Sequence, residues 1–395
     1  MPYTFSISRL PRIEFGAGKI STLAAIAHQF GTSFLIVTGA ASFTNSPAWL
    51  QILSDFAAAD LHYTHVIVAE EPSPQLIDDA VRRFRDTAID AVIGIGGGST
   101  LDAAKAIAGL LKSSHSVLDF LEGVGSELCY TGPSTPFIAI PTTAGTGSEA
   151  TKNAVLSTHG EQGYKKSFRD ERLIPEYAII DPDLLASCPP TLIAANGMDA
   201  LTQLLEALVS SKANPFTDAL AISGIDAAGQ HLLNWYHEPM SAKESAAAMA
   251  YAALLSGICL AQVGLGSVHG LASPLGAFFP IPHGIACGAL VAAATATNIN
   301  ALRLRMPESD ALRKYAQVGR LLARDANLGD AAAQDMLVET LTAWTHKMQI
   351  PRLGHYGVRA EDCPRIVANS RGSSMKTNPI ILTDNEIGEI VKQRL

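Results

Sequence analysis

The chain has 395 residues, a length typical of two or three domains. Its formal net charge of -8, from 29 Lys+Arg against 37 Asp+Glu, disfavours a nucleic-acid-binding protein, which usually carries a basic surplus. Hydrophobic residues make up 48% of the chain and charged residues only 17%, so ample apolar surface is available for burial and extensive disorder is excluded.

The first half alternates short apolar strands with helical segments. The helix predicted over 100–111 directly follows one of these strands. Apolar strands interleaved with helices are typical of a parallel sheet that is covered on both faces. The predicted strands are 33–38, 65–69, 91–95, 136–140 and 178–180.

After about Pro190 the strand signals stop and long Ala/Leu-rich helical segments follow, such as 198–209 and 245–260. We therefore predict an α/β domain over residues 1–186 and an all-α domain over residues 187–395.

One stretch, Ser245–Leu302, contains no Asp, Glu, Lys or Arg. A membrane span is the first alternative, because Ser245–Leu265 reaches the roughly 20 residues that a spanning helix needs. Its many alanines and small polar residues argue against insertion, and no Lys/Arg cluster flanks it. Three prolines that break helices follow, at positions 274, 280 and 282. We interpret the stretch as the buried helical core of a soluble domain.

The cysteines are odd in number and widely spaced, and none forms a CxxC pair; they are Cys129, Cys188, Cys259, Cys287 and Cys363. This pattern predicts neither a disulfide framework nor a structural zinc site. The first residues lack the basic start and apolar run of a signal peptide. Reduced thiols and this N-terminus favour a cytoplasmic protein.

A glycine-rich loop, Gly94–Ser99, follows a predicted strand and precedes a predicted helix. Backbone N–H groups of Gly96, Gly97 and Gly98 could approach an anion there, and a helix N-terminus favours negative charge. Ser99 is expected to cap the helix and to contact a phosphate. It also stands where the usual dinucleotide fingerprint has its last glycine. A tight turn is the alternative, but the glycines exceed what a turn needs, which favours pyrophosphate binding.

A second loop, Pro141–Glu149, also follows a predicted strand. Its threonines, Thr142, Thr143 and Thr146, could line a cofactor or substrate site at the carboxyl edge of the sheet. A solvated polar loop is an equal alternative on the residues alone.

Four side chains form a candidate metal site. Asp199 and Gln203 are spaced i, i+4 and share one helix face. His269 and His283 lie in the charge-free stretch, and His283 stands between Pro282 and Gly284. Two imidazoles and a carboxylate with an open position suit Zn²⁺ or Fe²⁺, and the Gln203 carbonyl could add an oxygen. Structural core histidines are the alternative.

Together these motifs resemble the iron-containing (group III) alcohol dehydrogenase family, nearly from end to end. Several long motifs occur in the family's order: PRIEFGAG (11–18) as an opening strand pair, GGGS (96–99) with Asp102 and Lys105, PTTAGTGSE (141–149), the Asp-bearing helix 197–206, the segment 269–284, and Asn378-Pro379 with Leu382-Thr383.

The resemblance implies a dehydroquinate synthase-like architecture, in which an N-terminal dinucleotide-binding domain precedes a helical domain and the active site lies between them. It implies hydride transfer between NAD(P)H and a small alcohol, aldehyde or ketone, with a divalent metal, Fe or Zn, polarising the carbonyl. The implied metal ligands are Asp199, Gln203, His269 and His283, and the implied catalytic residues are Asp199, His269 and His283. Asp102, Thr142, Thr143 and Lys165 match cofactor-contacting positions.

Two departures affect the implied pocket. Most members of the family carry His where this chain has Gln203, and many carry a second His where it has Ser273. The metal could then be bound more weakly, differ in identity or be absent. This leaves two alternatives: a metal-independent reductase of an acidic carbonyl substrate, similar to maleylacetate reductase, and a non-catalytic nucleotide-binding relative.

The end of the second predicted strand bears on the cofactor. Members that prefer NAD often carry Asp there to bind the ribose 2′-OH, whereas this chain has Gly39, followed by Ala40, Ala41 and Ser42. A 2′-phosphate meets no repulsion at such a site, which favours NADP(H) over NAD(H). We expect a small-molecule substrate, no nucleic-acid or membrane partner, and a homodimer.

Overall fold

The computed structural model describes residues 4–160 and 162–395. The chain forms two compact units, an α/β unit and a helical unit. The α/β unit comprises Ser8–Thr158 and Lys165–Cys188, and Pro189–Leu395 makes up most of the helical unit. The predicted division at 186/187 does not anticipate two short segments, within Met1–Ile7 and His159–Tyr164, which group with the helical unit.

A six-stranded parallel sheet forms the centre of the α/β unit, in the order β1-β8-β5-β4-β2-β3. Each of the five strands predicted from the sequence is present in it. The strands are β1 (Arg12–Phe15), β2 (Ser33–Gly39), β3 (His62–Val68), β4 (Ala91–Gly96), β5 (Phe137–Pro141) and β8 (Tyr177–Ile180).

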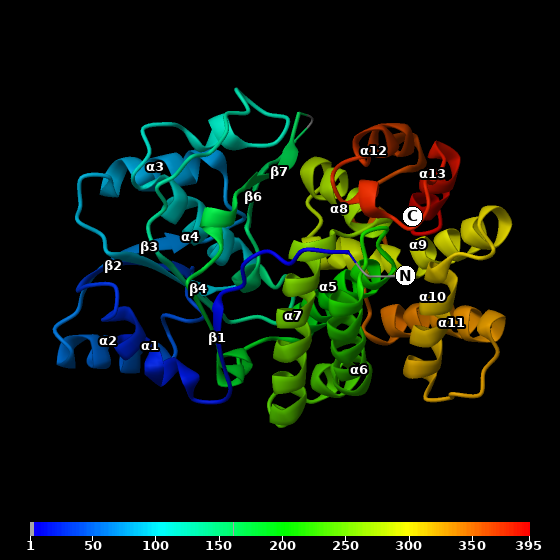
Figure 1. The fold of residues 1–395 in the computed structure, drawn as a ribbon, viewed down its shortest axis with the longest axis horizontal. Coiled ribbons are helices and arrows are strands. Elements are labelled where there is room, and N and C mark those ends of the chain that lie inside the picture. Colours follow the sequence, from blue (N-terminus) through cyan, green and yellow to red (C-terminus); the bar gives the residue numbers. More distant parts are fainter. Residues whose placement is uncertain (1–3, 161) are drawn as a thin grey trace. The chain divides into compact units, whose positions relative to one another are not determined.

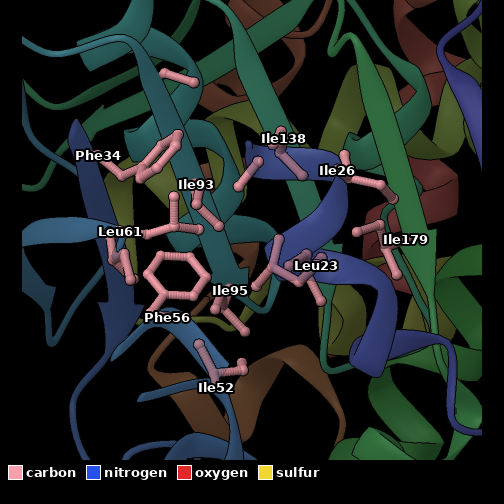
Figure 2. Packing of buried hydrophobic residues seen from close by; sticks show 14 of the residues in the cluster. Leu23, Ile26, Phe34, Ile52, Phe56, Leu61, Ile93, Ile95, Ile138 and Ile179 are labelled. Atoms are coloured by element: carbon pink, nitrogen blue, oxygen red, sulfur yellow. The ribbon is translucent and has the colours of Figure 1, made fainter. Parts of the chain in front are cut away.

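The sheet is covered on both faces, as predicted. Helices α1 (Leu23–Ala27) and α2 (Pro47–Ala58) pack on one face, where Leu23 and Phe56 meet Ile93 and Ile95 of β4 (Figure 2). Helix α4 (Gly98–Leu110) packs on the other face, and α3 (Pro74–Phe84) lies beside it. Gly94 lets α4 approach closely, because a Cβ there would lie 2.8 Å from the Ala104 methyl.

Two parts of the α/β unit differ from the sequence expectation. The opening motif forms one strand, β1, rather than a strand pair, and β1 adds to the sheet beside β8. A separate two-stranded sheet, β6 (Asn153–Thr158) and β7 (Tyr164–Arg169), was not predicted. Strand β7 is mostly polar, and the apolar residues of β6, Ala154–Leu156, lie between polar ends, so neither strand shows a long apolar run.

The second unit is helical throughout its longer elements, as predicted. Helices α5, α6 and α7 pack against one another, and α9 packs against α5 (Figure 1). The helices are α5 (Pro190–Val209), α6 (Pro215–His237), α7 (Lys243–Val263), α8 (Ser267–Phe278), α9 (His283–Arg305), α10 (Asp310–Ala323), α11 (Asp330–Lys347), α12 (Cys363–Asn369) and α13 (Asp384–Lys392).

The charge-free stretch forms most of α7, all of α8 and most of α9. By length and composition alone, α5, α7 and α9 could each cross a membrane, and 67% or more of each apolar window is buried inside the structure. Packing within the helical unit therefore accounts for their composition. Pro274 does not break a helix as expected but lies inside α8, whereas Pro280 and Pro282 occupy the break before α9.

Candidate functional site

Several of the predicted cofactor residues, those of the glycine and threonine loops and Gly39, lie at the carboxyl ends of neighbouring strands. From β2 the chain moves outward to β3 and then returns to the other side of β2 with β4. The strand order therefore reverses between β2 and β4, and nucleotides bind open α/β sheets at such a reversal. Gly39 ends β2, and the glycine-rich segment Gly94–Ser99 includes the last residues of β4 and the first residues of α4.

The glycine loop and the threonine loop pack against each other there. Thr142 N donates to Gly96 O at 3.0 Å. A Cβ at Gly97 would lie 3.3 Å from Thr143 Oγ1, and one at Gly98 would lie 2.7 Å from the Thr146 methyl. The glycines thus allow the threonine loop to lie close to the start of α4, so both loops form one surface rather than separate turns.

Ser99 does not have the capping role expected of it. Helix α4 begins at Gly98 with Gly97 as its N-cap, and no side chain caps it. Ser99 stands within the first turn, where its side chain is exposed. The backbone N–H groups at this end of α4 are therefore left uncapped by side chains, which suits an anion.

Asp102 and Lys165 both make contacts within the protein. Asp102 Oδ1 accepts from Ser148 Oγ at 2.5 Å, and its Oδ2 accepts from Val155 N at 3.0 Å. Asp102 thereby connects α4 to the threonine loop and to β6. Lys165 Nζ lies 2.8 Å from Glu71 Oε1. The cofactor contacts expected of these two residues stay predictions.

The predicted metal ligands converge inside the helical unit, on three different helices. Asp199 and Gln203 lie on α5, His269 on α8, and His283 is the first residue of α9. Asp199 Oδ1 lies 3.2 Å from His269 Nε2 and 3.6 Å from His283 Nε2. The side chain of Asp199 is 0% exposed, whereas that of His283 is 28% exposed. The cluster is therefore open to solvent on the side of His283.

A further donor, which was not predicted from the sequence, belongs to this cluster. Cys287 stands one turn after His283 on α9, and its Sγ lies 3.6 Å from His269 Nε2 and 3.8 Å from His283 Nε2. Four possible ligand atoms lie within 4.8 Å of one another, one each from Asp199, His269, His283 and Cys287. The i, i+4 spacing of His283 and Cys287 is the sequence signal that could have identified it.

Glu206, also absent from the predicted site, holds His269 in position. Its Oε2 lies 2.6 Å from His269 Nδ1, and its Oε1 accepts from Val268 N at 2.6 Å. Because a carboxylate only accepts, His269 Nδ1 carries the proton, and in the neutral ring Nε2 is then free to bind a metal. Gly266 makes room for this contact, since a Cβ there would lie 2.9 Å from Glu206 Oε1.

Gln203 presents its amide nitrogen, not its oxygen, to the cluster. Its Nε2 lies 3.4 Å from Asp199 Oδ2, and its Oε1 lies 2.9 Å from Ser256 Oγ. A carboxylate oxygen accepts and cannot donate, so Asp199 selects this orientation. Ser273, the other departure from the family pattern, is half-buried on α8, one turn after His269.

Two pKa shifts show the electrostatic character of the cluster. Burial alone would raise the pKa of Asp199, but the facing rings of His283 and His269 outweigh it and lower this pKa to about 2. Burial would likewise lower the pKa of His269, yet Cys287, Asp199 and Glu206 raise it well above its ordinary value. Both shifts favour a positive charge at the centre. Two imidazoles, a carboxylate and a thiol around such a point fit a divalent transition metal.

Comparisons with known proteins identify similar families and relatives. A family model described as "Iron-containing alcohol dehydrogenase" matches residues 11–182, and one described as "Fe-containing alcohol dehydrogenase family, C-terminal" matches residues 193–395. The chain is 32% identical over 397 residues to the NAD-dependent methanol dehydrogenase of Bacillus methanolicus, with 98% of both proteins covered.

Two further proteins are similar over most of their length. The lactaldehyde reductase of Escherichia coli strain K12 is 31% identical over 357 residues, which cover 89% of each protein. The crystal structure of a 1,3-propanediol oxidoreductase matches the fold with a TM-score of 0.89 at 28% identity, and 100% of both chains are covered.

Proposed function

The chain belongs to the iron-containing alcohol dehydrogenase family, and we propose that Asp199, His269 and His283 hold the divalent metal of its active site. The protein is an oxidoreductase that transfers a hydride between a nicotinamide cofactor and small alcohols or carbonyl compounds. The convergence of two imidazole nitrogens on one buried carboxylate oxygen carries the proposal.

The residues of the chain have distinct parts in this reaction. The N-terminus of α4 and the threonine loop receive the cofactor pyrophosphate, through backbone N–H groups and hydroxyls. Asp199 supplies the negative charge of the metal site, and Glu206 orients His269 toward it. Held by Asp199, His269 and His283, a divalent metal would supply Lewis-acid polarisation of the carbonyl oxygen. His283, as the partly exposed ligand, borders the side from which a substrate reaches the site.

Turnover measured before and after metal removal tests this proposal. Purified protein should oxidise NADH or NADPH in the presence of small aldehydes. Dialysis against a chelator should abolish this turnover, and Zn²⁺ or Fe²⁺ should restore it. Full activity in protein shown to be metal-free by elemental analysis would contradict the metal-assisted reaction and favour the metal-independent reductase instead.

We extend the proposal to the cofactor, for which NADP(H) is favoured over NAD(H). No carboxylate lies between Gly39 and Asn45 to bind the ribose 2′-OH or to repel a 2′-phosphate. No Arg or Lys lies there either, so the expected preference is modest. The relative from Bacillus methanolicus is NAD-dependent by name, so the proposal rests on this chain's own residues.

Replacing Gly39 by Asp should reverse this preference. The backbone tolerates the change, since a Cβ at Gly39 would make an ordinary contact of 3.6 Å with Thr100 Oγ1. In Gly39→Asp, the ratio of kcat/KM for NADPH to that for NADH should fall about tenfold or more, roughly 1.4 kcal/mol, because the new carboxylate repels the phosphate. Gly39→Asn is the uncharged control and should change the ratio little. A wild-type protein that prefers NADH would contradict the proposal.

A further inference from the structure

We propose that Cys287 is the fourth protein ligand of the metal and binds it as a thiolate, so that the site favours Zn²⁺ over Fe²⁺. This inference rests on the proposed metal site of Asp199, His269 and His283. It replaces Gln203, the residue that the sequence suggested, by a side chain from a different helix.

Four of the six distances between the donor atoms match the separations that a tetrahedral zinc site requires. With bonds of about 2.0–2.3 Å, two N or O ligands stand about 3.4 Å apart, and a sulfur and a nitrogen about 3.6 Å apart. The Asp199 Oδ1 to imidazole distances are 3.2 and 3.6 Å. The Cys287 Sγ to imidazole distances are 3.6 and 3.8 Å. Together with the 4.8 Å within which all four donor atoms lie, these distances place the donors around one point where a small ion could bind.

Gln203 is excluded from this set by what its amide contacts. Its nitrogen faces Asp199 Oδ2 at 3.4 Å, and its oxygen is directed to Ser256 Oγ at 2.9 Å. An amide nitrogen that keeps both protons has no lone pair to offer a metal. In this position Gln203 donates to Oδ2 of Asp199, whereas the two imidazoles lie near Oδ1. Cys287 faces those two imidazoles.

The placement of Cys287 suits a ligand better than an ordinary core thiol. It is completely buried on α9, and it faces two imidazole nitrogens one turn from His283. Thiolate is a soft ligand that binds Zn²⁺ strongly, and mixed N, O and S tetrahedral sites are typical of zinc. As the metal–sulfur bond forms, the thiol S–H bond breaks and its proton passes to solvent; no electron transfer is involved.

Cobalt substitution tests the assignment without depending on activity. Metal-free full-length protein loaded with Co²⁺ should show a sulfur-to-cobalt charge-transfer band in the near ultraviolet. Cys287→Ala should lose this band, and its affinity for Zn²⁺ should fall on the order of 100-fold or more. Cys259→Ala is the matched control, because Cys259 is also a buried helical thiol but donates to Thr217 O at 3.5 Å. This variant should keep both the band and the affinity.

A double variant checks that the loss comes from the ligand and not from the fold. An imidazole at position 203 would stand one turn from Asp199 on α5. Cys287→Ala combined with Gln203→His should therefore regain Co²⁺ binding while the charge-transfer band stays absent. In addition, the wild-type protein should bind Zn²⁺ more tightly than Fe²⁺ in anaerobic competition.

The outcomes separate this inference from the proposed function. Stoichiometric Co²⁺ binding by the wild-type protein without a thiolate band would overturn the Cys287 assignment and leave the metal-assisted function standing. A band that persists in Cys287→Ala would also overturn it. A band without turnover of any substrate would overturn the proposed function alone. Failure to bind Co²⁺ at all would overturn both the assignment and the metal-assisted reaction. If Cys287→Ala does not fold, the presence or absence of the thiolate band in the wild-type spectrum still tests the Cys287 assignment.

Discussion

Glu206 determines which nitrogen of His269 faces the donor cluster. It lies about two helical turns after Asp199 on the same helix, and its two oxygens bind the ring of His269 and the backbone at the start of α8. One buried carboxylate therefore holds both the tautomer of His269 and the position of the helix that carries it.

Replacing Glu206 by Gln should weaken metal binding more than it weakens the fold. An amide at this position cannot accept from both the ring and the backbone, so His269 loses its fixed tautomer. We expect a fall in Zn²⁺ affinity of about 10- to 100-fold, measured by competition with a chromophoric chelator. Glu244→Gln, at an exposed position at the start of α7, is the control and should bind as the wild type does. Unchanged affinity in Glu206→Gln would contradict the positioning role.

At the scale of the elements, the contact between α5 and α9 depends on a residue without a side chain. Gly284 is the second residue of α9, and a Cβ there would lie 2.4 Å from Ala195 O on α5. Ala195 and Asp199 share one helix face, so this contact brings the start of α9 next to the carboxylate. Gly284 thus allows His283 and Cys287 to reach Asp199.

Gly284→Ala should destabilise the helical unit and also disturb the metal site. The new methyl would collide with backbone, which can only move by shifting a helix, so we expect a loss of about 1–3 kcal/mol in the free energy of unfolding of metal-free protein. Urea unfolding and Zn²⁺ titration measure the two effects. Gly388→Ala is the matched control, since Gly388 is also buried in a helix but a Cβ there would meet Val367 at an ordinary 3.8 Å. A stable Gly284→Ala variant with normal metal affinity would refute this account.

At the scale of the whole molecule, a chain with few charges buries several of them together in the α/β unit. Lys105 Nζ donates to Ser148 O at 2.8 Å and to Asn153 O at 2.7 Å, and so connects α4 to the threonine loop and to β6. Burial lowers the pKa of Lys105 to about 8. It raises the pKa of Glu149, the residue after Ser148 in the threonine loop, to about 7. The stability of this unit should therefore depend on pH near neutrality.

The sign of this dependence follows from Glu149. Its ordinary pKa is 4.5, and the folded value of about 7 means that the folded state binds the proton more tightly than the unfolded state. The stabilisation is fully present below pH 4.5 and is lost as the pH rises through about 7. This difference corresponds to up to about 3 kcal/mol.

Glu149→Gln should remove this loss, because its side chain stays neutral at every pH. Urea unfolding at pH values between 4.5 and about 7 should show a free energy of unfolding that falls for the wild type and falls less for the variant. Glu70→Gln, at an exposed position, should follow the wild type. Equal slopes in all three proteins would contradict the prediction.

The two-part architecture could be predicted from the sequence because the patterns that indicate it are local. The apolar strands of the sheet, the glycine and threonine loops that follow two of them, and the long helices of the second half each depend on residues that are neighbours in the sequence. The β6–β7 pair was not predicted because β7 is mostly polar and β6 has only three apolar residues between polar ends. Asp199, His269 and His283 were identifiable as ionisable groups in otherwise apolar helices.

The sequence by itself determined the two-part architecture, and it singled out the glycine and threonine loops and three members of the donor cluster, because periodicity, glycines and rare polar residues are properties of short segments. Only the tertiary structure decided that Cys287 faces the cluster, that Gln203 turns its nitrogen to Asp199, and that Glu206 fixes His269. The contacts of Cys287 and Glu206 join residues on different helices. Their distances depend on how closely α5, α8 and α9 pack, which is set by the space left at glycines such as Gly266 and Gly284 and cannot be read from any one segment.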